Sequence, residues 1–154
     1  AVHEAGHAVM ADLEGVSISR VCLDHDGYVP PQPGDAAAPE HGRRAASLRP
    51  TGFGAPAAQA MAMILAGEAA GSLRWRRRPP EGSSGGGDRR RAHVLARDLT
   101  GGDDVEAALL LDQQWRRTCE RLDEPRLWGR VERIAASLLE RRRLEGAALR
   151  ALLE

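Results

Sequence analysis

The stretch AAQAMAMILAGEAAGSLRW (57–75) constrains the fold of this chain more than any other segment. Before Arg74 it carries only one charged side chain, Glu68, so it predicts a helix that is buried on most of its sides. The apolar residues of the chain are mostly Ala, Leu and Val, which favours helices that pack closely through small side chains. We therefore expect a mainly α fold, a compact helical domain of about five to six helices.

Apolar spacing and end signals predict the other helices. In residues 1–14, Val2, Val9 and Leu13 share one helical face, and Gly15 is the stop. The same reasoning predicts further helices over 88–99, 103–122, 123–143 and 145–153.

One short segment has the pattern of a strand rather than a helix. Residues 16–23 (VSISRVCL) alternate and are rich in β-branched side chains. Asp26 and Gly27 then favour a turn with a return at residues 28–29, so we expect a small strand or hairpin element near residues 16–29.

Size and cysteine content suggest one domain in a reducing compartment. The 154 residues fit a single domain over 1–154, with flexible loops near 30–56 and 76–87. The chain begins without Met, inside its first predicted helix, so we expect a truncated N-terminus. Cys22 and Cys119 are too few and too far apart for a disulfide framework, and we expect a bacterial cytoplasmic protein.

Composition also argues against several classes of function. The chain has no lysine, and a phosphate-binding P-loop requires one, so ATP-driven work is not encoded in it. No apolar run has the roughly 20 residues that a membrane span needs. No nucleic-acid partner is expected, because the net charge is zero and the arginines near 74–80 and 88–91 are typical of a solvated surface.

The segment AVHEAGHAVMADL at the start of the chain contains the pattern H-E-x-x-H. His3 and His7 are four residues apart and lie on one face of the predicted helix, so both imidazoles can bind one zinc ion. Glu4 lies beside that face, where it can act as general base on a water that the ion activates. The alternative is a surface helix whose histidines only pack or cap.

A catalytic zinc needs a third protein ligand and an open position. The compact pattern with a third histidine is absent, since Met10 and Leu13 stand at its Gly and His positions. Glu68 and Asp88 are the better candidates, although Glu68 could equally form a salt bridge and Asp88 an ordinary helix cap. Spacing and composition do not choose between the two. Isolated histidines offer weaker alternatives: His25, His41 and His93.

Several segments together resemble the peptidase domain of FtsH, the ATP-dependent zinc metalloprotease. The opening is similar to the usual H-E-A-G-H-A of that family, and SSGGGDRRRAHVLARDL (83–99) is similar to its S-x-G-A-x-x-D-x-x-x-A-x-x-x-A-R segment. ILAGEAAGSL (64–73) and VERIAASLLERRRLEGAALRALL (131–153) match more loosely. The resemblance covers most of the chain in order and implies a helical zinc-peptidase domain.

The resemblance implies a role for each matching site residue. His3, His7 and Asp88 would be the zinc ligands, Glu4 the catalytic base, and the 16–23 strand the edge along which substrate lies. The implied substrates are peptides or unfolded proteins. A homo-oligomer or a separate ATPase partner would be needed for the cleavage of folded proteins.

The chain also departs from the family pattern, and this leaves two functions open. Gly71 replaces an acidic residue, and the 97–104 connection is shorter than usual. The first function is a zinc-dependent endopeptidase with Glu4 as general base. The alternative is a zinc-binding but proteolytically inactive module with an assembly or regulatory role.

Overall fold

The structure, a computed structural model, describes residues 1–23, 57–75 and 86–154. Within these ranges it contains six helices and two short strands, which confirms the expected mainly α fold. In chain order they are α1 (Val2–Leu13), β1 (Arg20–Cys22), α2 (Ala57–Trp75), α3 (Gly86–Leu99), α4 (Asp104–Leu122), α5 (Pro125–Arg141), β2 (Arg143–Glu145) and α6 (Gly146–Leu153).

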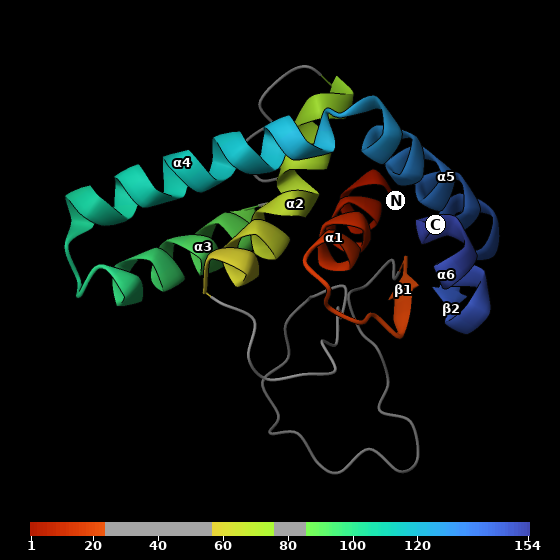
Figure 1. Ribbon diagram of the computed structural model, residues 1–154, viewed down its shortest axis with the longest axis horizontal. Coiled ribbons are helices and arrows are strands. Elements are labelled where there is room, and N and C mark those ends of the chain that lie inside the picture. The colour runs from red at the N-terminus through yellow and green to blue at the C-terminus, as the bar shows by residue number, and fades with distance from the viewer. Residues whose placement is uncertain (24–56, 76–85) are drawn as a thin grey trace, which may run out of the picture.

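Helix α2 lies at the centre of the molecule, between α1 on one side and the α3–α4 pair on the other (Figure 1). The prediction that it is buried on most sides is confirmed, since most of its residues from Met61 to Ala70 are buried. Glu68 is the one charged member of this buried stretch. The helix therefore contributes to the packing of both halves of the fold.

Helices α1 and α2 cross at very short range because small residues meet there. A Cβ atom added to Gly6 would lie 2.6 Å from both the Ala66 carbonyl oxygen and the Ala70 Cβ atom. Only glycine fits at this point, since real Cβ atoms do not approach other atoms so closely. The crossing brings the histidines of α1 against the backbone of α2.

Two groups of buried side chains divide the described residues into what we call the body and the arm. The body consists of α1, β1, α5, β2 and α6, and its core includes large side chains such as Met10, Ile134 and Leu138. The arm consists of α3 and α4, which run side by side away from the body in Figure 1. Its core is formed by Ala92, Ala96 and Ala107 against residues of α2.

The strand element differs from the sequence prediction in its length and its partner. The strand is limited to Arg20–Cys22, and it pairs in antiparallel register with Arg143–Glu145. The predicted helix over 123–143 ends at Arg141, because Arg142 adopts the left-handed conformation (φ 65°) and leads the chain into β2. The predicted return at 28–29 lies outside the described residues.

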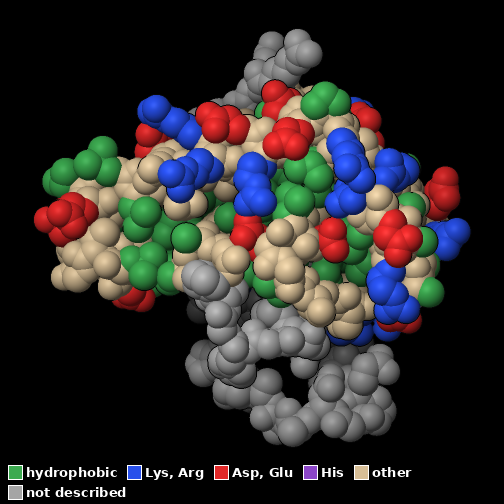
Figure 2. All heavy atoms as spheres, in the orientation of Figure 1, with side chains coloured by type: hydrophobic (Ala, Val, Ile, Leu, Met, Phe, Trp, Pro, Cys, Tyr) green, Lys and Arg blue, Asp and Glu red, His purple; other side chains and the backbone are tan. Residues whose placement is uncertain are grey.

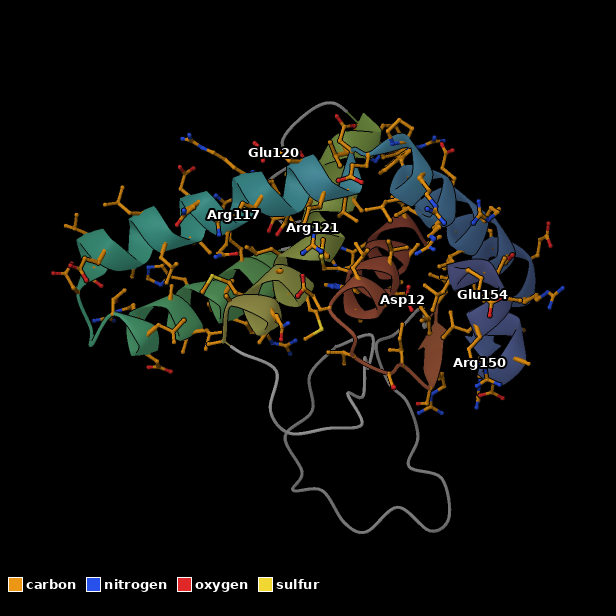
Figure 3. All side chains as sticks on the ribbon, viewed as in Figure 1. Asp12, Arg117, Glu120, Arg121, Arg150 and Glu154 are labelled. Atoms are coloured by element: carbon orange, nitrogen blue, oxygen red, sulfur yellow. The ribbon has the colours of Figure 1, made fainter. Side chains whose placement is uncertain are left out.

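Charged groups of both signs cover the face shown in Figure 2, over the arm as well as the body. Some of them link separate elements: Arg130 of α5 donates to Asp12 of α1 (3.3 Å) and to the Glu154 carbonyl (3.1 Å), near the labelled Asp12 and Glu154 of Figure 3. Among the helices that the structure describes, none is both long enough and apolar enough to cross a membrane.

Candidate metal centre

His3 and His7 lie one turn apart on α1, and their imidazoles converge as the sequence predicts. Their Nε2 atoms are 3.1 Å apart, and the two rings are nearly perpendicular, at 86°. His3 keeps partial access to solvent, whereas His7 is buried. No histidine is visible on the face shown in Figure 2.

The orientation of His7 is fixed by the backbone of α2. Its Nδ1 atom lies 2.7 Å from the Met63 carbonyl oxygen, which can only accept a hydrogen bond. Nδ1 therefore carries the proton, and in the neutral ring Nε2 presents a lone pair toward His3. Metal-binding histidines commonly use one ring nitrogen in this way to hold the other in place.

Gly67 of α2 leaves the space in which the two imidazoles meet. A Cβ atom at this position would lie 2.6 Å from His3 Cε1 and 2.7 Å from His3 Nε2, and closer still to His7 Nε2. Any larger residue would displace both rings. This role of Gly67 is not predicted from the sequence, although a glycine inside an apolar helix is itself a signal of close packing.

Asp88 completes the cluster from the first turn of α3. Its Oδ2 atom lies 3.1 Å from His3 Nε2 and 3.2 Å from His7 Nε2. Because α3 begins at Gly86, Asp88 lies inside the helix and is not its N-cap. Its second oxygen is 3.6 Å from Nη1 of Arg91, one turn further on.

Three potential ligand atoms thus form a nearly equilateral triangle with sides of 3.1–3.2 Å. Atoms that bind one tetrahedral zinc ion at ~2.0–2.1 Å lie about 3.3–3.4 Å apart, so small movements would suffice to accommodate the ion. All three atoms can act as acceptors, and lone pairs repel at such distances unless a proton or a cation lies between them. Among the described residues, this is the one group of three or more such side chains close enough to share a metal.

In the absence of a metal, the contacts between Asp88 and the two histidines shift the pKa values of Asp88 and His7 in opposite directions. Burial alone would raise the pKa of Asp88, but hydrogen bonds from His3 and His7 and their charges hold it well below its usual range. Burial would lower the pKa of His7, but the hydrogen bond and the charge of Asp88 outweigh this and raise it. Without metal, a proton on His7 therefore stabilises the aspartate.

Glu4 lies on the same helix as the histidines, beside the cluster. Burial raises its pKa, and although the charges of His3 and His7 act against this shift, they do not cancel it. The same interactions show that Glu4 is within electrostatic reach of both histidines and of Asp88. Its carboxylate is therefore a stronger base than one on an open surface.

Glu68, the competing candidate for the third ligand, does not join the cluster. Its Oε1 atom accepts a hydrogen bond of 3.3 Å from Arg89 Nη1, and the Arg89 guanidinium lies 5.3 Å from the ring centroid of Trp115 on α4. The second carboxylate oxygen, Oε2, is buried without a hydrogen-bond partner. Gly67 thus lies against the two histidines, while the neighbouring Glu68 binds Arg89, the residue after Asp88.

The other predicted site features lie apart from the triangle or outside the described residues. His93 is half-buried in α3 and is not part of the cluster of His3, His7 and Asp88, while His25 and His41 lie outside the described ranges. Nothing lies within 4 Å of a Cβ placed at Gly71, so this turn of α2 is open. The short connection after Arg97 is a turn capped by Asp103, whose Oδ1 accepts from two backbone amides of α4 at 2.9 Å.

Comparison with known proteins adds no assignment to this geometry. No protein-family model matches the chain. A search of curated proteins likewise gives no match. The residues of the cluster and their chemistry therefore carry the functional argument.

Proposed function

We propose that the chain is a zinc-dependent endopeptidase that hydrolyses peptide bonds in peptides or unfolded proteins. The observation that carries this proposal is the triangle of His3, His7 and Asp88 with Glu4 on the same helix. The resemblance of the HEAGH segment and of the 83–99 segment to the peptidase domain of FtsH supports the same roles. A Zn²⁺ ion in this triangle would supply Lewis acidity to a substrate carbonyl and lower the pKa of a nearby water.

The residues of the chain divide the remaining work. Glu4 takes a proton from the attacking water, whose oxygen forms a bond to the carbonyl carbon. When the peptide C–N bond breaks, Glu4 passes this proton to the departing amine nitrogen, and the carboxylate is restored. The Met63 carbonyl holds the ring of His7, and Gly67 keeps the space around both imidazoles free.

The range of substrates accessible to these 154 residues depends on whether they can unfold proteins. They contain no lysine and therefore no P-loop, so ATP-driven unfolding is not supplied by them. Peptides and unfolded segments are the substrates accessible to them alone. Cleavage of folded proteins would need an ATPase from outside these 154 residues.

The test combines zinc content with cleavage of casein or of a labelled peptide, in the wild type and in Glu4→Gln. We expect Glu4→Gln to keep its zinc and to lose about 100-fold or more in cleavage rate, because it can no longer accept the proton. Glu140→Gln, an exposed change on α5, serves as the matched control and should cleave at the wild-type rate. Cleavage that survives the Glu4→Gln change would refute the mechanism.

A second candidate function is a zinc-binding module that does not cleave protein and acts in assembly or regulation. Two features favour it: the open turn at Gly71, which carries no acidic group, and the exposed Val105 and Leu109 of the arm, which a partner could cover. Stoichiometric zinc without cleavage of any unfolded substrate would support this candidate. Glu4-dependent turnover would exclude it.

A further inference from the structure

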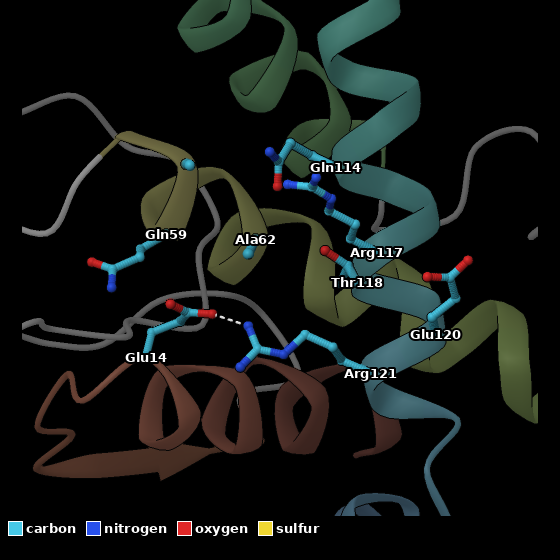
Figure 4. Close-up of a pocket in the computed structure, with 9 residues that line it drawn as sticks. Glu14, Gln59, Ala62, Gln114, Arg117, Thr118, Glu120 and Arg121 are labelled. Carbon is cyan, nitrogen blue, oxygen red and sulfur yellow. Dashed lines mark hydrogen bonds and ion pairs between the residues drawn. The ribbon is translucent and has the colours of Figure 1, made fainter.

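A pocket lies between α2 and α4. Its volume is about 290 Å³, at the lower end of the range for small-molecule sites. The α2 wall is formed by the small residues Ala58 and Ala62 with Gln59, and Arg121 of α4 lies beside Glu14 of α1 on another side (Figure 4). None of these residues belongs to the metal-ligand cluster.

Three polar side chains of α4 line this pocket from one helical face. Gln114, Arg117 and Thr118 are spaced at i, i+3 and i+4, and Figure 4 shows their polar ends gathered on the same side of the helix. The Thr118 side chain is 1% exposed, yet its hydroxyl oxygen has no hydrogen-bond partner. A buried polar group in this state costs free energy unless something binds to it.

Two arginines and two glutamates are among the residues that line the pocket: Arg117, Arg121, Glu14 and Glu120. Glu14 is neutralised by its ion pair with Arg121, and the carboxylate of Glu120 points away from Arg117 and Gln114 in Figure 4. Arg117 forms no ion pair with another residue that the structure describes, and its guanidinium points along the pocket wall beside Gln114. A guanidinium, an amide and a hydroxyl together can donate several hydrogen bonds to a planar anionic group.

We propose that this pocket binds a small carboxylate, with Arg117 pairing its charge and Gln114 and Thr118 donating hydrogen bonds to its oxygens. The alanines of α2 leave room for a short apolar group attached to the carboxylate. The carboxylate belongs either to a free organic acid or to the C-terminus of a short peptide. This binding does not depend on the metal centre.

The test is a ¹H–¹⁵N NMR titration of the whole chain with sodium acetate, N-acetylglycine and its neutral analogue N-acetylglycinamide. The neutral chelator 1,10-phenanthroline is present, so that no carboxylate binds through a metal. We expect N-acetylglycine to shift the Gln114 side-chain amide and the Arg117 Nε–H signals in a saturable way, with a Kd of about 1 mM. N-acetylglycinamide should cause no saturable shift.

Two variants and one control identify the residues that bind. Arg117→Gln should raise the Kd about tenfold, since it removes the charge-assisted hydrogen bonds. Thr118→Val should raise it roughly threefold without lowering the stability of the fold, because the hydroxyl it removes has no partner. Arg116→Gln is the control, since Arg116 lies on the same helix but is exposed and paired with Asp112.

The same titrations separate the two sources of the carboxylate. Acetate and N-acetylglycine binding alike would indicate a free acid, whereas tighter binding of N-acetyl-triglycine would indicate a peptide C-terminus. Either result supports carboxylate recognition. The proposal is overturned if the amide binds as well as the acid, or if Arg117→Gln and Arg116→Gln have the same effect.

Discussion

The body and the arm of this molecule are held together in different ways. The body buries large side chains, among them Met10, Ile134 and Leu138, and its stability comes mainly from apolar burial. In the core of the arm, the fully buried side chains of α3 and α4 are alanines packed against α2, the larger apolar side chains of this cluster are only partly buried, and Val105 and Leu109 are exposed. Small side chains remove less apolar area from water, so the arm depends more on polar links to the rest of the fold.

Two such links lie next to each other at the start of α3. Asp88 reaches the histidines of α1, and Arg89 reaches Glu68 of α2. The candidate metal centre therefore joins the arm to the body, with two candidate ligands from the body and the third from the arm. We expect changes at the metal centre to affect the arm more than the body.

The largest effect is expected from Gly67→Ala. The added Cβ atom would occupy the space of both imidazoles, so zinc binding should be lost and the free energy of unfolding should fall by about 2 kcal/mol. Elemental analysis and denaturant unfolding measure the two effects. Gly71→Ala, one turn later in open space, is the matched control and should raise stability by up to about 1 kcal/mol. Wild-type zinc content in Gly67→Ala would contradict the packing argument.

Asp88→Asn should weaken zinc binding by about 100-fold or more while keeping the shape of the side chain. The amide cannot supply the anionic oxygen, and it removes the charge that stabilises a proton on His7. Competition with a chromophoric chelator measures the zinc affinity. Asp98→Asn, exposed on the same helix, should bind zinc as the wild type does. Equal affinities in the two variants would remove Asp88 from the site.

The pH dependence of stability should have opposite signs without and with zinc. In the metal-free protein, the raised pKa of His7 and the lowered pKa of Asp88 stabilise the fold fully between about pH 4 and 6.5. This stabilisation is lost as the pH rises through the raised pKa of His7, and also as it falls through the lowered pKa of Asp88. Zinc requires deprotonated ligands, so its contribution to stability grows as the pH rises through the raised pKa of His7, where the metal-free stabilisation is lost.

Urea unfolding at pH 6 and pH 8 tests this reversal. The metal-free protein should be less stable at pH 8 than at pH 6, and the zinc-loaded protein more stable at pH 8. The charge of Glu4 is one of the causes that raise the pKa of His7, so the metal-free loss should be smaller in Glu4→Gln but still present. A metal-free protein that gains stability from pH 6 to pH 8 would contradict the assigned interactions.

The smallest effect is expected from Glu68→Gln, which weakens the link between Arg89 and α2. Amide hydrogen exchange in the first turn of α3 should become a few-fold faster, while α1 and α5 are unaffected, because local opening begins where few apolar contacts hold the chain. Glu106→Gln, exposed on α4, is the control. Uniformly faster exchange in all helices would indicate a global loss of stability instead of a loosened arm.

The helices of this fold could be predicted well because their signals are local. The range 57–75 is predicted to the residue, since its apolar composition marks α2 directly. The pairing of β1 with β2 could not be predicted, because it joins segments far apart in the chain and depends on the left-handed Arg142. Periodicity alone continues the helix through that residue.

The candidate site was predictable only in part, for the same reason. His3 and His7 share a helical face by spacing, but the choice between Asp88 and Glu68 depends on where α3 begins relative to α1. The resemblance to a peptidase family favoured Asp88, and the structure places its carboxylate beside the histidines. The role of Gly67 follows from the close crossing of two helices, which spacing within one helix does not reveal.

The two-stranded sheet has a consequence for the order in which the chain folds. Its paired residues lie over a hundred positions apart, and closing a loop of that length costs about 4 kcal/mol of chain entropy. Three residue pairs cannot offset this cost alone, so we expect the strands to pair only after α1 has packed against α2 and α5. A substitution such as Leu144→Ala should therefore accelerate unfolding and leave the rate of folding nearly unchanged.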